Sequence, residues 1–228
     1  MKKLLCILTA ISVVMFFAPR AHAEQTKWDD LLIDSARVFE EVMQMPEKSI
    51  PKSLLNDCQA IAIFPSTVSG GFIIGAKFGQ GVVLYKDKAG KTFSAPAFFD
   101  IGGGSFGLQI GGQATDIVLV IMSERGVDGL LKSKFKLGAD AGVAAGPIGR
   151  DAQVDTDLQL KGTIFSYSRS RGLFAGVKLE GAIVSPNKEA NRSMYKKDLS
   201  AKEILIEGKV KATESAQRLI KDLTEQAF

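Results

Sequence analysis

Apolar residues recur at spacings of three and four between residues 27 and 45, and this period predicts an amphipathic helix. Thr26 and Asp29 have the spacing of an N-terminal capping box, and Pro46 marks the end. The opposite face is largely acidic, whereas helices that lie on membranes usually carry Lys and Arg there. We therefore expect the helix to pack on the core, through Trp28, Leu31, Leu32, Ser35, Phe39 and Val42.

Beyond residue 57 the pattern changes to short apolar runs separated by glycine, proline and charged turns, which predicts strands. Their connections are too short for crossover helices, so neighbouring strands should run antiparallel. The expected strands are residues 59–64, 71–78, 82–86, 95–101, 106–110, 115–122, 157–167 and 173–184. Further helices are expected at 124–131, after the capping box of Ser200 and Glu203 with its end at Gly208, and at 210–226.

These elements predict an α+β fold, with a largely antiparallel curved sheet or barrel-like β core and flanking N- and C-terminal helices. The first 23 residues look like a secretory signal peptide, because Lys2 and Lys3 precede an apolar run that ends near the cleavage pattern Ala21-His22-Ala23. The expected layout is a signal peptide (1–23), a helical segment (24–57), a β-rich core (58–186) and C-terminal helices packing on that core (187–228). The signal peptide predicts that the mature protein is exported across the membrane.

After removal of the expected signal peptide, the composition excludes several kinds of partner and active site. The 228 residues carry 29 bases and 25 acids, and losing residues 1–23 leaves 26 bases against 25 acids, so we expect no nucleic-acid partner. The single histidine, His22, lies in the removed segment, and Cys58 is then the one remaining cysteine. This excludes histidine-based triads, zinc sites with histidine ligands and an intramolecular disulfide. We assign no catalytic residue, no metal ligand and no cofactor.

Two motifs admit a functional alternative. Residues 102–107 fit G-x-G-x-x-G, but a strand-like segment follows where a dinucleotide site needs a helix, so we interpret them as a glycine bulge or close strand crossing. Asp151, Asp155 and Asp157 lack the further ligand and glycine of a calcium loop, and a solvated strand face is the simpler interpretation. Paired carboxylates for hydrolysis remain a further hypothesis.

Basic residues form the more informative pattern. Lys132, Lys134 and Lys136 alternate, so in an extended segment they project from one face, and Arg169 and Arg171 do the same in another segment. One interpretation is a solvated strand edge that discourages pairing. The other is a patch for anionic lipid headgroups, with the neighbouring apolar residues Leu173 and Phe174 touching the acyl boundary.

Several segments, in order along the chain, resemble the SYLF-domain family in its bacterial secreted form. They are residues 60–65 (AIAIFP), 70–72 (GGF), 94–98 (SAPAF), 102–111 (GGGSFGLQIG), 114–116 (ATD), 134–140 (KFKLGAD), 144–150 (AAGPIGR) and 166–176 (SYSRSRGLFAG). The resemblance implies a lipid-binding module. Eukaryotic members are associated with phosphoinositides, and yeast actin-patch members also with actin.

The resulting expectation is a non-catalytic protein of the bacterial cell envelope that recognises anionic phospholipid headgroups or a membrane surface through its basic patch. Actin is not expected as a partner of a periplasmic protein. The alternative is a structural or protein-interaction module of the envelope, in which glycine-rich strand edges pair with an envelope protein.

Overall fold

A computed structural model describes residues 18–45, 49–72, 74–87, 89, 91–106, 113–149, 164–170, 173–177 and 179–228. The helices are α2 (Ala18–Met43), α3 (Lys52–Asp57), α4 (Glu124–Leu130), α6 (Lys188–Tyr195), α7 (Ala201–Leu205) and α8 (Glu214–Ala227). The strands are β1 (Ala60–Phe72), β2 (Ile74–Tyr85), β3 (Ala97–Phe106), β4 (Gln113–Ile121), β5 (Phe135–Lys136), β6 (Val143–Ala145), β7 (Ile164–Ser170), β8 (Leu173–Gly176) and β9 (Ile183–Pro186).

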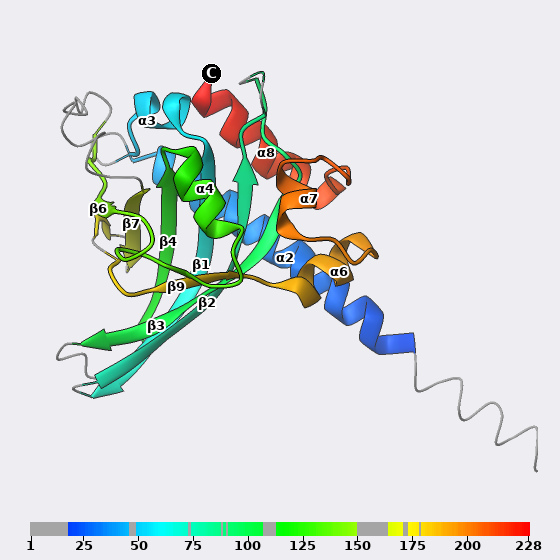
Figure 1. The fold of residues 1–228 in the computed structure, drawn as a ribbon, viewed down its shortest axis with the longest axis horizontal. Coiled ribbons are helices and arrows are strands. Elements are labelled where there is room, and N and C mark those ends of the chain that lie inside the picture. The colour runs from blue at the N-terminus through cyan, green and yellow to red at the C-terminus, as the bar shows by residue number, and fades with distance from the viewer. Residues whose placement is uncertain are drawn as a thin grey trace, which may run out of the picture.

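The described strands form one curved sheet in the order β5-β9-β3-β2-β1-β4-β7-β6, with β8 also paired to β7 (Figure 1). Among the described pairings, β6 with β7 is parallel and the others are antiparallel. The predicted α+β class is therefore confirmed, including its curved and largely antiparallel sheet with flanking helices.

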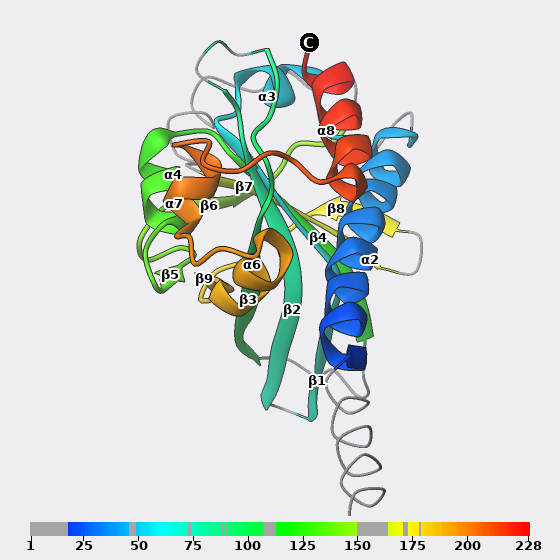
Figure 2. The ribbon, with the colours of Figure 1, turned by 90° about the vertical axis from the view of Figure 1, so that its right-hand side faces the viewer.

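Each face of the sheet is covered by its own helices, because alternate residues of a strand point to opposite faces. Ile61 and Ile63 pack with α2, α3, α6 and α8, whereas Ala60, Ala62 and Phe64 pack with α4 and α7. Figure 2 shows α2 and α8 on one side of the sheet and α4 and α7 on the other. The predicted inner face of α2 is buried as expected, with Leu31 partly buried.

Strand β1 continues past Pro65, where the sequence predicted an end. A β-bulge absorbs the proline, because the pairing with β2 steps from Ile63 to Val68 over five residues of β1 but only four of β2. Ser66 at the bulge has a positive φ of 48°. The expected break in β2 is likewise absent, since Gly79 and Gly81 lie inside the strand.

These two glycines make room for the bulge. A Cβ atom on Gly79 would lie 3.0 Å from the Cβ of Thr67, and one on Gly81 would lie 2.5 Å from a ring carbon of Phe64 and closer still to the carbonyl oxygen of Ile63. There is therefore no room for a side chain at Gly79 or Gly81, where the bulge of β1 approaches β2. The glycines mark a close strand approach and not a turn.

Other predicted boundaries also needed correction. The expected strand 173–184 is two strands, β8 and β9, separated by a turn in which Gly181 has a φ of 81°. The glycine run 102–104 lies inside β3, and a Cβ on Gly103 would lie 3.2 Å from the Cα of Ala182, which confirms a close approach in place of a cofactor loop. Helices α3 and α6 were not predicted, because their eight residues or fewer show little periodicity.

Helix α6 is fixed to the edge of β3 by one buried side chain. The Asn191 amide donates to the carbonyl oxygen of Phe98 (3.2 Å) and accepts from the Phe98 N–H (2.8 Å). We expect Asn191→Ala to lower the free energy of unfolding by about 2 kcal/mol, because the buried Phe98 N–H loses its acceptor, while the Phe98 carbonyl oxygen keeps the N–H of Asn187 (2.9 Å). Urea unfolding checks this, with the exposed Asn56→Ala as control; equal effects of the two changes would contradict it.

Candidate functional site

The three candidate lysines lie together at one edge of the sheet. Leu130 ends α4, the chain turns, and Phe135 and Leu137 enter the core while Lys132, Lys134 and Lys136 stay exposed. Gly129 lets the Phe135 ring pack closely on α4, since a Cβ there would lie 2.7 Å from a ring carbon of Phe135.

The local backbone holds this edge in place. Strand β5 pairs with β9 alone among the described strands, and the Lys136 N–H donates to the Asp140 carboxylate (2.7 Å). Within the described part of the chain, none of the three lysine ammonium groups forms an ion pair. The edge therefore presents three ammonium groups that have no ion-pair partner among the described residues.

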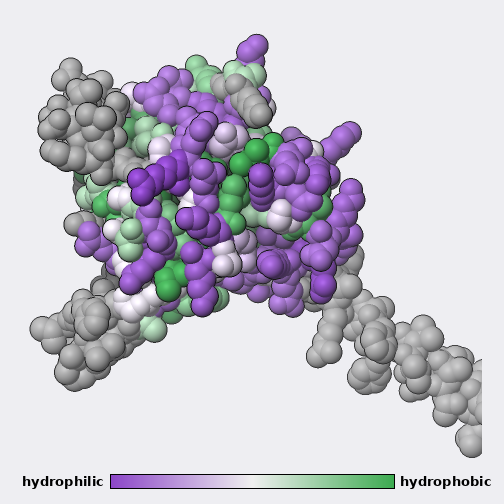
Figure 3. Space-filling view, viewed as in Figure 1, coloured by the Kyte–Doolittle hydropathy of each residue, from purple (hydrophilic) through white to green (hydrophobic). Residues whose placement is uncertain are grey.

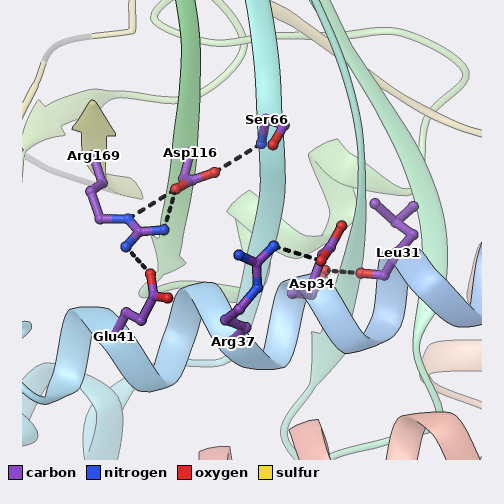
Figure 4. Close-up of polar contacts among 8 residues, drawn as sticks. Leu31, Asp34, Arg37, Glu41, Ser66, Asp116 and Arg169 are labelled. Atoms are coloured by element: carbon purple, nitrogen blue, oxygen red, sulfur yellow. Dashed lines mark hydrogen bonds and ion pairs between the residues drawn. The ribbon is translucent and has the colours of Figure 1, made fainter. Parts of the chain in front are cut away.

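Arg169 does not join these lysines. Its strand, β7, lies on the far side of the sheet order from β5, and its guanidinium donates to Asp116 through Nη2 (2.6 Å) and Nε (2.9 Å) and also pairs with Glu41 (Figure 4). The Arg169 and Asp116 side chains are only 17% and 15% exposed. We call Glu41, Asp116 and Arg169 the clamp, because they join α2 to β4 and β7.

The clamp also fixes the β1 bulge. The second carboxylate oxygen of Asp116 accepts the backbone N–H of Ser66 (2.8 Å), the residue with positive φ. Burial raises the pKa of Asp116, and the Ser66 N–H opposes that rise. Sequence reasoning missed these partners of Arg169, although a lone acid in the apolar segment 114–121 is a signal for a buried pair.

The two residues expected to contact the membrane differ in exposure. Leu173 is exposed at the start of β8, whereas Phe174 is buried and stacks on Tyr167 with ring centroids 5.3 Å apart. Phe174 therefore supports the core in this structure and does not lie at a surface. Arg171 lies outside the described residues, as do Asp151, Asp155 and Asp157.

The described residues show little that favours bond-making chemistry. Burial raises the pKa of the Cys58 thiol to about 12, so it stays protonated at neutral pH. Among the residues that the structure describes, no three His, Cys, Asp or Glu side chains gather as a metal site. No described helix combines the length and apolar character needed to cross a bilayer.

One small cavity lies between α2 and α8. It has a volume of about 230 Å³ and is lined by Phe39, Glu40, Met43, Gln44, Asp222, Glu225 and Gln226. Arg218 neutralises Glu40 across its rim at 2.6 Å, and burial raises the pKa of Asp222. On another part of the molecule, the surface over α4, α6 and α7 is mainly hydrophilic (Figure 3).

Comparison with known proteins places the chain in a family. A family profile described as "Ysc84: Las17-binding protein actin regulator" matches residues 102–226, which is more than half of the chain. The chain belongs to the Ysc84 (SYLF-domain) family. This confirms the family resemblance found in the sequence.

Curated relatives extend the match. The human "SH3 domain-containing YSC84-like protein 1" is 36% identical over 172 residues, covering 74% of this chain and 50% of that protein. "Protein YSC84" of Saccharomyces cerevisiae is 34% identical over 185 residues, covering 80% of this chain and 39% of that protein. The chain thus spans half or less of these relatives' length. Their names denote no enzyme, and the family description concerns actin regulation, which runs against our expectation that actin is not a partner.

Proposed function

We propose that this protein binds anionic phospholipid surfaces without catalysing a reaction, and that Lys132, Lys134 and Lys136 contact the headgroups. The observation that carries the proposal is the exposed sheet edge with three lysines that no described carboxylate neutralises. Each Lys near an anionic bilayer contributes about 1 kcal/mol to binding. Together they contribute about 3 kcal/mol, which adds to any apolar contact with the bilayer.

Arg169 has a different role in this proposal. Its guanidinium is already paired with Asp116 and Glu41, so headgroup binding there would require the clamp to open. We assign Arg169 to the attachment of α2. Headgroup binding is assigned to Lys132, Lys134 and Lys136, which we call the lysine edge. The setting we propose is the periplasmic side of a bacterial envelope, reached through the signal peptide.

Replacing Lys132, Lys134 and Lys136 together with Gln should weaken binding to phosphatidylglycerol vesicles about 30- to 150-fold at low salt, because roughly 2–3 kcal/mol of attraction is lost. Vesicle sedimentation measures this. The control changes Lys52, Lys91 and Lys211, which are also exposed, to Gln. If both triple variants lose the same affinity, net charge and not the lysine edge is responsible.

The same preparation tests the alternatives. Pelleting with filamentous actin in the absence of vesicles would favour the association in the family's description. Recovery of a stoichiometric envelope protein without retained lipid would favour an envelope interaction module.

A further inference from the structure

An exposed row of residues crosses six neighbouring strands at one end of the sheet. The ends of β1, β2 and β3 project away from the helices in Figure 1, and those of β1 and β2 reach past the end of α2 in Figure 2. The register places directly opposite residues on one face of the sheet. Starting from the lysine edge, the row is Lys136, Ile183, Gly102, Phe78, Val68 and Ala114.

The row is apolar and open to solvent. Val68 and Phe78 are each 58% exposed and lie side by side on β1 and β2, and Ile183 is 38% exposed. A Cβ on Gly102 would meet nothing closer than 3.6 Å, so the strip between Ile183 and Phe78 is low and unobstructed. Exposed large apolar side chains that line up across strands are a binding surface more often than an accident of the fold.

The sequence around the row is almost free of charge. Residues 66–80 contain one charged residue, Lys77, and residues 101–115 contain none, in a chain that is 24% charged. Neither of these two segments contains an acid that would repel an anionic surface. At its near end the row terminates in Lys136, one of the three lysines that we propose for headgroup binding.

We propose that Val68, Phe78 and Ile183 enter the acyl boundary of an anionic bilayer while Lys136 and its neighbours hold the headgroups. The inference rests on the proposed function and adds the apolar anchor to it. The row continues the lysine edge through direct strand pairing, and strand spacings of about 4.8 Å put Phe78 roughly 14 Å from Lys136 along the sheet.

The small size of the row and its paired backbones favour a bilayer over a second copy of the chain. Stable protein interfaces bury about 800 Å² per partner, which three partly exposed side chains do not approach. Shallow insertion needs only a few apolar groups when lysines assist. Val68 and Phe78 also stand on strands whose backbones are paired on both sides, so little unpaired backbone enters the apolar boundary.

Tryptophan placed in the row should report contact with acyl chains. Phe78→Trp is compared with Phe228→Trp, whose parent side chain is 57% exposed at the C-terminus, far from the row (Figure 1). Trp28 is buried and common to both variants, so the unaltered chain supplies the baseline. On phosphatidylglycerol vesicles with brominated acyl chains, we expect strong quenching of tryptophan fluorescence in the Phe78→Trp variant. The Phe228→Trp variant should show no quenching beyond that of the unaltered chain.

A second variant measures the contribution to affinity. Phe78→Ser removes an exposed side chain, and we expect about 10-fold weaker vesicle binding with unchanged urea unfolding. Vesicle binding without quenching at position 78 would overturn the anchor while leaving lipid binding intact. Absence of vesicle binding by the unaltered chain would instead remove the proposed function itself. A concentration-dependent dimer abolished by Phe78→Ser would assign the row to a second copy and overturn the inference.

Discussion

Gly81→Ala should lower the free energy of unfolding by about 3–4 kcal/mol, because the new methyl group has no room beside the bulge of β1. It would lie 2.5 Å from a ring carbon of Phe64 and closer still to a backbone oxygen, neither of which can move without disturbing a buried strand. Urea unfolding followed by circular dichroism measures the loss.

Gly102→Ala is the matched control. This glycine lies in the neighbouring strand β3, and its added Cβ would make only an ordinary contact with the Lys77 carbonyl oxygen at 3.6 Å. We expect a change within about 1 kcal/mol, because lost flexibility of the unfolded chain offsets small strain. If Gly81→Ala is equally mild, the close approach of β1 and β2 is not as described.

Arg169→Met should cost about 3 kcal/mol, because it leaves the Asp116 carboxylate largely buried without its cation. Glu41 loses its partner at the same time, so the attachment of α2 to β4 and β7 is also weakened. Hydrogen exchange of α2 amides should therefore accelerate more than exchange in β2.

Arg37→Met supplies the comparison, because Arg37 lies on α2 one turn before Glu41. Arg37 pairs with Asp34 at 2.7 Å, but the two side chains are 57% and 45% exposed, so the pair contributes under about 1 kcal/mol. Equal losses from the two arginine variants would contradict a specific clamp at Arg169.

The local patterns predicted helices α2, α4, α7 and α8 and most strand positions, but not α3 and α6. Burial of one face of α2 follows from the spacing of Trp28, Leu32 and Phe39, and the Ser200–Glu203 capping box forms as the sequence indicated. The strand ends were less predictable. Pro65 and Gly79 usually end strands, but a bulge and a close packing contact keep both inside long ones.

The candidate site depended on register, which the sequence does not reveal. Lys132, Lys134 and Lys136 are exposed, but only Lys136 lies in a strand, and Ser133 between the first two is exposed as well. That Arg169 meets Asp116 from 53 residues away, and that Lys136 lies in line with Ile183 and Phe78, follow only from how β9, β3 and β7 pair. Phe174 was expected at a surface beside Leu173, although consecutive residues of a strand point to opposite faces, and only Leu173 is exposed.

The central claim is that the lysine edge makes this protein a reversible ligand of anionic membranes. Sedimentation of the unaltered chain with phosphatidylglycerol vesicles, at low salt and again near 1 M salt, tests it most directly because added salt screens charge beyond about 3 Å. We predict binding at low salt, a steep loss at high salt and little binding to phosphatidylcholine alone. Equal recovery with both lipids, or none with either, would contradict the account.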